Sequence, residues 1–88
     1  MKKMARREAK MYYDQALSFL GQGQVKKSIE FLDKALSLNK HNEKVYAYRG
    51  YYQQLLGNNK EAMADYEKAL AINAENEFAK YYLKQLKK

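Results

Sequence analysis

The sequence predicts an all-α protein that repeats a helical hairpin. The 88-residue chain is rich in Ala, Leu, Lys, Glu and Gln, which are strong helix formers, and no stretch alternates apolar and polar residues as a strand does. Residues that break helices recur 34 positions apart, namely Gly23 and Gly57, Asn39 and Asn73, and Asn42 and Asn76. A period of this length is typical of a solenoid, in which each unit is a hairpin that cannot bury its apolar face alone.

Four breaks divide the chain into the elements that we expect. Residues 21–23 and 57–59 favour tight turns, because Gly and Asn tolerate the left-handed backbone that ends a helix. The other breaks end at Asn42 and Asn76, and each of these is followed by Glu. An Asn at the N-cap accepts hydrogen bonds from unpaired amides, and a Glu in the first turn suits the helix dipole. The predicted helices span residues 5–21, 25–38, 43–56, 60–72 and 77–87.

The repeat also covers residues between the breaks. A shift of 34 places Tyr12 on Tyr46, Lys26 on Lys60, and residues 34–36 on residues 68–70. The sequence resembles the tetratricopeptide repeat family, whose pattern is W-x2-L-G-x2-Y, then A-x3-F, then P. The pattern falls in the first unit on Tyr12, Gln15, Ala16, Phe19, Ser28, Leu32 and Lys40. It falls in the second unit on Tyr46, Arg49, Gly50, Gln53, Ala62, Tyr66 and Ala74.

The departures from the family pattern are also informative. Both prolines are missing, so the helix ends must rely on Asn, and the leucine position is polar in both units.

The resemblance implies a short right-handed α-solenoid that forms one domain over residues 1–88. We expect a basic flank at 1–8, repeats at 9–42 and 43–76, and a capping helix at 77–88.

The composition offers little for catalysis. The chain has no cysteine, which excludes thiol chemistry and cysteine-based metal sites. His41 is the one histidine, and it falls in a predicted turn. The glycine pair at 21 and 23 lacks the Lys-Ser/Thr of a phosphate-binding loop. We therefore expect a protein that is not an enzyme and uses no metal or cofactor.

Tyrosine is the informative residue type, because nine are present and the packing positions of the family do not absorb them all. The resemblance implies that the first helix of each hairpin lines a concave groove. The groove positions that we predict to bind a peptide are Lys10, Tyr13, Leu17, Lys44, Tyr48, Tyr51, Phe78 and Tyr82. Helical spacing independently places Tyr48 and Tyr51 on one face. The alternative is that these rings only fill the core or are covered by a second copy of the chain.

The partner that we predict is a protein or peptide segment. Some family members hold a chaperone C-terminal carboxylate with Lys, Asn and Arg, but the corresponding positions here carry Tyr13, Leu17, Tyr48, Phe78 and Tyr82. An apolar or amphipathic segment is therefore the better expectation, with Lys10 and Lys44 steering an acidic flank. Self-association is a further possibility, because two repeats present a small groove.

The charge of the chain suggests a second possible function. The net charge is +7, and the cations concentrate near the two ends of the chain. A nucleic-acid-binding or ribosome-associated protein is the rival function, but no recognition motif accompanies the charge. We favour the interpretation that the charged ends keep the solenoid in solution, and we do not expect nucleic acid as the partner. A third possibility is an engineered or excised scaffold without a native ligand. No secretory signal or membrane span is visible, so we expect a cytoplasmic location.

Overall fold

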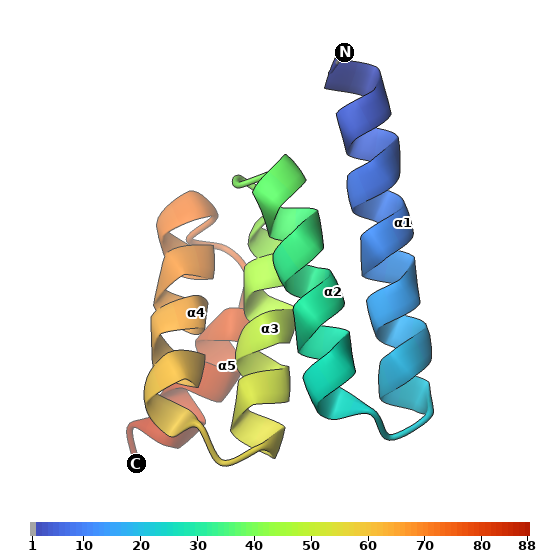
Figure 1. The fold of residues 1–88 in the computed structure, drawn as a ribbon. Coiled ribbons are helices and arrows are strands. Elements are labelled where there is room, and N and C mark those ends of the chain that lie inside the picture. Colours follow the sequence, from blue (N-terminus) through green and yellow to red (C-terminus); the bar gives the residue numbers. More distant parts are fainter. Residues whose placement is uncertain (1) are drawn as a thin grey trace. The chain divides into compact units, whose positions relative to one another are not determined.

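The computed structural model describes residues 2–88, with side chains from residue 6 onward, and over this range it is helical without a strand (Figure 1). The helices are α1 (Lys2–Gly21), α2 (Val25–Leu38), α3 (Glu43–Leu55), α4 (Asn59–Ile72) and α5 (Glu77–Leu86). The all-α prediction is confirmed. Helix α1 begins at Lys2 instead of residue 5, and each other bound lies within one residue of its prediction. The chain forms two compact units, the first ending at His41 and the second spanning Asn42–Lys88.

The first unit is an antiparallel hairpin of α1 and α2, and the N-terminal turns of α1 extend beyond the end of α2 (Figure 1). Small residues lie where the two helices pack. Ala16 and Ser28 are fully buried, and the Ser28 hydroxyl donates a hydrogen bond to the Ala16 carbonyl oxygen at 2.7 Å. Because neither side chain extends beyond one heavy atom from Cβ, the helices can approach closely. Ala16 and Ser28 stand at the glycine and alanine positions of the family pattern, where small residues are expected.

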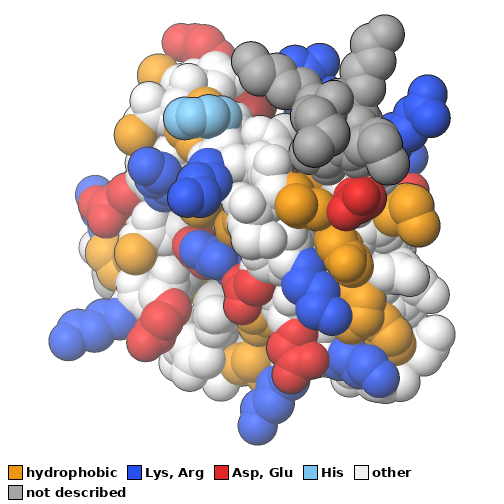
Figure 2. Space-filling model, turned by 45° about the horizontal axis from the view of Figure 1, so that its top comes forward, with side chains coloured by type: hydrophobic (Ala, Val, Ile, Leu, Met, Phe, Trp, Pro, Cys, Tyr) orange, Lys and Arg blue, Asp and Glu red, His pale blue; other side chains and the backbone are white. Residues whose placement is uncertain are grey.

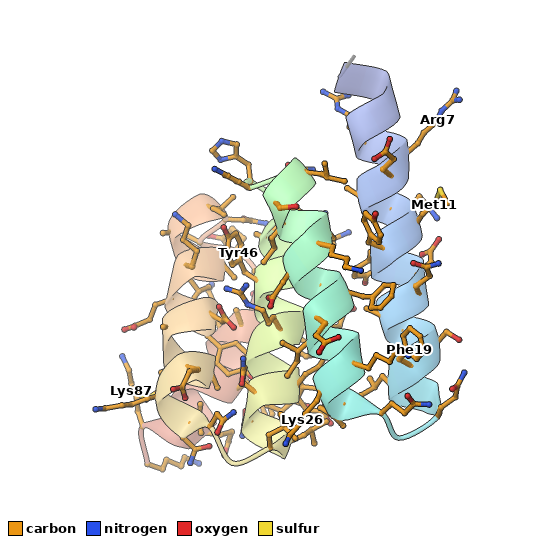
Figure 3. All side chains as sticks on the ribbon, in the orientation of Figure 1. Arg7, Met11, Phe19, Lys26, Tyr46 and Lys87 are labelled. Atoms are coloured by element: carbon orange, nitrogen blue, oxygen red, sulfur yellow. The ribbon has the colours of Figure 1, made fainter. Side chains whose placement is uncertain are left out.

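An aromatic row completes this hairpin. Phe31 of α2 contacts Phe19 and Tyr12 of α1, with ring centroids 5.0 and 6.1 Å apart. Lys34 lies over the rings of Phe31 and Tyr12, at 4.4 and 5.6 Å from their centroids. Arg7 and Met11 lie on the side of α1 that faces away from α2 (Figure 3). The rings of Tyr12 and Phe31 are only half-buried, and the Lys34 ammonium group covers both of them.

The second unit pairs α3 with α4 and adds α5, which packs mainly on α4. Its core contains alanines and two large side chains, namely Ala47, Ala62, Tyr66, Ala69, Ala79 and Leu83. Gly50 lies opposite Tyr66, and a Cβ atom built on it would be 2.9 Å from Cε1 of that ring. The glycine at this position therefore allows the Tyr66 ring to lie directly against α3.

The two glycine turns adopt the predicted left-handed backbone. Gly23 has a φ of 78° and Gly57 a φ of 83°, which side-chain-bearing residues rarely adopt. No other residue type in the described part of the chain has a positive φ. The left-handed role that we allowed for Asn in the second turn is therefore not used.

Asparagine instead works through its side chain at the proline-free breaks. The side chain of Asn42 accepts hydrogen bonds from the amides of Lys44 and Val45, as the N-cap prediction requires. The Asn76 side chain accepts one from the amide of Ala79. Each cap satisfies amides that a helix start leaves without an intrahelical partner.

Candidate functional site

Four aromatic residues of the second unit form a continuous cluster, which we call the aromatic face: Tyr48, Tyr51, Phe78 and Tyr82. The first two lie one turn apart on α3, and the other two lie one turn apart on α5. Ring centroids are 5.1 Å apart for Tyr48 and Phe78, 5.1 Å for Tyr51 and Tyr82, and 4.7 Å for Phe78 and Tyr82. All four side chains are half-buried, so each ring packs on its neighbours and keeps an accessible part.

Two buried tyrosines support the aromatic face from beneath. Tyr52, only 1% exposed, contacts the rings of Tyr48 and Tyr51. Tyr66 of α4 is fully buried, stacks on Tyr82 with centroids 6.1 Å apart, and donates a hydrogen bond to Gln54 Oε1 at 2.8 Å. Aromatic pairs of this kind contribute about 0.5–1.5 kcal/mol beyond the area that they bury. The accessible rings therefore pack on a buried layer of two tyrosines.

The ionisation of these supporting rings is suppressed. Burial raises the pKa of Tyr52 to about 12, and the neighbouring Tyr48 and Tyr51 hydroxyls add to the rise. Burial also raises the pKa of Tyr66 well above its ordinary value. Removing water penalises the charged phenolate, so both rings stay neutral at physiological pH.

The border of the aromatic face carries one cation and one exposed ring. Lys44 is exposed and lies one turn before Tyr48 on α3. Tyr81 is 58% exposed and meets Tyr82 edge-on, with centroids 4.9 Å apart. The face therefore offers an apolar centre, hydroxyl groups and a positive charge at one end.

The remaining predicted site residues lie on α1 in the first unit. Lys10 is exposed and forms an ion pair with Asp14 at 3.0 Å. Tyr13 is half-buried, and Leu17 is 39% exposed. The structure thus brings together four of the predicted aromatic residues with Lys44 at their border, and it places the other three on a separate hairpin.

The sequence reasoning missed an ion pair that joins α3 to α4. Arg49 Nε donates to Asp65 Oδ2 at 3.0 Å, and Arg49 Nη2 donates to Asp65 Oδ1 at 2.8 Å. The Asp65 side chain is 9% exposed and that of Arg49 is 25% exposed. Arg49 occupies the family's leucine position, so its polar character was the available signal. The acidic partner 16 residues later could not be assigned without the helix pairing.

Chemically reactive groups do not gather in the part of the chain that the structure describes. His41 is exposed after α2, and its amide donates to Asn39 Oδ1. The described residues contain no group of three or more His, Asp or Glu side chains that could hold a metal ion. Nor is any helix among them long and apolar enough to cross a membrane.

Comparison with known proteins accounts for the hairpins. A sequence model of the tetratricopeptide repeat matches residues 9–42 and 44–76, which is most of the chain. The chain belongs to the tetratricopeptide repeat family. A similar solved structure is the tetratricopeptide repeat domain of OM64 from Arabidopsis, with 33% sequence identity and a TM-score of 0.85. The alignment covers 90% of this chain and 65% of that one, so this chain spans less than two thirds of the domain that it matches.

Membership of the family bears on the type of function. Tetratricopeptide repeats generally mediate protein–protein interactions and are typically not catalytic. The second matched repeat ends at residue 76, so α5 follows the matched repeats. Two of the four aromatic-face residues lie on this additional helix.

Proposed function

We propose that this protein binds a segment of another protein, and that the aromatic face of the second unit is the main contact. The observation that supports this proposal is the arrangement of four accessible rings from two helices over a buried tyrosine layer. Rings held in this way offer a large rigid contact area at little cost in side-chain entropy. Each tyrosine also carries a hydroxyl that can pair with a polar group of the partner.

The chemistry of the face selects an apolar or amphipathic partner. Its central rings favour aliphatic or aromatic side chains of the partner, which lose contact with water on binding. Lys44 at the border favours an acidic residue next to this apolar part. The carboxylate of a chain terminus would find aromatic rings and Leu17 at the positions where other family members hold it with polar groups.

Residues of the first unit form a second contact in the proposal. Tyr13 and Leu17 supply accessible apolar surface, and Lys10 supplies charge that Asp14 partly neutralises. Self-association and a cytoplasmic location stay predictions from the sequence.

The test compares variants in which tyrosine side chains on opposite sides of α3 are replaced by alanine. Short peptides selected from a random phage-displayed library on the full chain serve as probes. Tyr48→Ala combined with Tyr51→Ala should weaken their binding about tenfold or more, because central aromatic contacts dominate such interfaces. The control is Tyr46→Ala, which removes a half-buried ring from the same helix where it lies over Arg49 and Lys68.

The control should keep peptide binding, even if it lowers stability as much as the double variant does. Circular dichroism of each variant checks that its helices are retained. If the selected peptides bind the double variant as tightly as the unchanged protein, the aromatic face is not the binding site. A library that yields no binding peptide would contradict the proposed function itself.

A further inference from the structure

A hollow lies between α4 and α5 in the second unit, separate from the aromatic face. It has a volume of about 310 Å³ and is lined by Leu70, Lys80, Leu83, Lys84 and Lys87. Leu70 is half-buried and Leu83 is 9% exposed, so Leu70 provides most of the apolar surface, and the three lysines give the hollow a positive border. None of these residues belongs to the aromatic face, and the proposed function leaves them without a role.

The repeat shows what the hollow corresponds to. A shift of 34 places four residues of α3 on three residues of α5 and its C-cap that line the hollow, pairing Tyr46 with Lys80, Arg49 with Leu83, Gly50 with Lys84, and Gln53 with Lys87. Three of these α3 residues, Tyr46, Arg49 and Gly50, face α4. Arg49 binds Asp65 of α4, and Gly50 lies against the Tyr66 ring. The hollow therefore lies on the side of α5 that corresponds to the side of α3 occupied by α4.

We propose that an acidic amphipathic helix of a partner protein docks in this hollow and packs beside α5 as α4 packs beside α3. Apolar side chains spaced three and four residues apart would contact Leu70 and Leu83. Carboxylates flanking that apolar stripe would reach the lysines. This proposal does not depend on the function of the aromatic face.

Charge determines the kind of helix that fits. Lys84 replaces the glycine, and Lys87 replaces an uncharged glutamine, so the docking side of α5 is more basic than that of α3. Lys80 lies 3.7 Å from a Glu75 carboxylate oxygen and 3.8 Å from one of Glu77. Lys84 and Lys87 form no ion pair with any residue that the structure describes. Two lysine ammonium groups are thus available to a carboxylate-bearing partner.

A second copy of the chain fits the hollow less well than an acidic partner does. The chain carries a net charge of +7. Helix α4 has one more acidic residue than basic residues, but its Asp65 is already bound by Arg49. Docking of two such chains would bring like charges together, which opposes association.

The test uses a fluorescein-labelled synthetic helix of the same length as α4, with one stripe of leucines flanked by glutamates. A scrambled peptide of identical composition removes the stripe but keeps the charge. Fluorescence anisotropy with the full chain should show saturable binding of the striped peptide and at least about tenfold weaker binding of the scrambled one. Lys84→Glu combined with Lys87→Glu should weaken binding of the striped peptide about tenfold or more.

Two comparisons make this result specific. Lys26→Glu combined with Lys60→Glu alters the net charge equally at exposed positions outside the hollow, and it should change binding less than about twofold. A striped peptide with lysines in place of its glutamates should bind the Lys84→Glu, Lys87→Glu protein and restore most of the lost affinity. In the aromatic-face variant, Tyr48→Ala with Tyr51→Ala, the hollow is unchanged, so adding Lys84→Glu with Lys87→Glu should weaken binding of the striped peptide by the same factor as in the unchanged protein. Binding that remains in the aromatic-face variant and depends on the two lysines therefore tests the hollow apart from the proposed function.

Several outcomes would overturn the proposal. Equal binding of the scrambled peptide, or equal weakening by the control pair of lysines, would reduce the effect to general charge attraction. Sedimentation that shows a dimer dispersed by Lys84→Glu and Lys87→Glu would make a second copy the occupant. If phosphatidylserine-containing vesicles bind through the same two lysines and the peptide does not bind, the occupant of the hollow would be a membrane surface. If the Lys84→Glu, Lys87→Glu variant loses helix content, Lys84→Gln with Lys87→Gln provides the same comparison.

Discussion

Gly50 is the position where one added methyl group has the clearest consequence. A Cβ atom there would lie 2.9 Å from Cε1 of Tyr66 and 3.1 Å from the Ala62 carbonyl oxygen. The Tyr66 ring cannot move away easily, because it is fully buried and its hydroxyl is bonded to Gln54. The close packing of α3 and α4 therefore depends on glycine at this position.

We expect Gly50→Ala to lower the free energy of unfolding by about 1–3 kcal/mol, as overpacking of a buried site does. The better helix propensity of alanine offsets up to about 1 kcal/mol of the steric cost. Urea denaturation measures the difference. Gly21→Ala is the control, because nothing lies within 4 Å of its Cβ and it is helical, so its stability should be unchanged or slightly higher. Equal effects of the two substitutions would contradict the steric explanation.

The buried tyrosines predict how stability depends on alkaline pH. Tyr52 has a pKa of about 12 in the folded chain, above the ordinary value of 10.0 that applies when the chain is unfolded. The folded state thus holds this proton more tightly than the unfolded state does. The corresponding stability is fully present below pH 10 and is lost as the pH rises from 10 through about 12. The raised pKa of Tyr66 acts in the same direction and extends the loss to higher pH.

The measurement is urea denaturation at a series of alkaline pH values, with tyrosinate absorbance followed in the same samples. Tyr52→Phe removes this ionisable group and should flatten part of the pH dependence. Tyr81→Phe, which removes a tyrosine hydroxyl from a side chain that is 58% exposed, is the comparison for the loss of one hydroxyl group. A loss of stability unaltered by Tyr52→Phe would show that another group controls it.

At the scale of helices, the Arg49–Asp65 pair joins α3 to α4. Removing one partner leaves the other charge poorly solvated, whereas removing both leaves an apolar contact. Arg49→Met should lower the free energy of unfolding by about 2–3 kcal/mol, less than for a fully buried pair because the Arg49 side chain is 25% exposed. Arg49→Met combined with Asp65→Leu should recover most of this loss. Chemical denaturation of the unchanged protein, the Arg49→Met and Asp65→Leu single variants and the double variant decides the matter, and additive losses in the double variant would show that the pair does not act as a unit.

The elements themselves were largely predictable because their signals are local. The N-caps at Asn42 and Asn76 and the left-handed glycines at 23 and 57 depend on residues close by in sequence. The two hairpins also repeat a long-range contact. Lys68 lies over Tyr46 at 5.9 Å, as Lys34 lies over Tyr12 at 5.6 Å, and a shift of 34 superposes the two pairs.

Long-range pairings with no counterpart in the other hairpin were not predictable. Arg49 and Asp65 replace Gln15 and Phe31 of the first unit, so the repeat gave no precedent for an ion pair. The aromatic face had a partial signal, since helical spacing paired Tyr48 with Tyr51. The contact of these rings with Phe78 and Tyr82 depends on how α5 packs in the second unit, which spacing does not specify. The binding role of the predicted site residues stays a prediction.

At the scale of the whole chain, charge is the property that bears most directly on the choice of partner. Figure 2 shows basic and acidic side chains interspersed on the face that it presents. Near the ends of the chain, Arg6 and Arg7 are exposed in α1, and Lys84, Lys87 and Lys88 are exposed at the C-terminal end, where Figure 3 labels Lys87. The side chains at positions 1–5 of the predicted basic flank lie outside the described residues. An excess of +7 distributed in this way is sufficient for non-specific attraction to a polyanion.

We therefore expect a mixed RNA pool to bind only at low salt, with an affinity that falls steeply as salt rises, because counterion release drives such contacts. Filter binding across a salt series measures this dependence. Arg6→Gln with Arg7→Gln should make the salt dependence of the affinity less steep, because two cations are lost. Tyr48→Ala with Tyr51→Ala should leave the salt dependence unchanged, because charge attraction does not use these rings, whereas base stacking would. Binding that persists at physiological salt and depends on the tyrosines would instead make the aromatic face a base-stacking surface. That result would favour the nucleic-acid function over the protein-binding one.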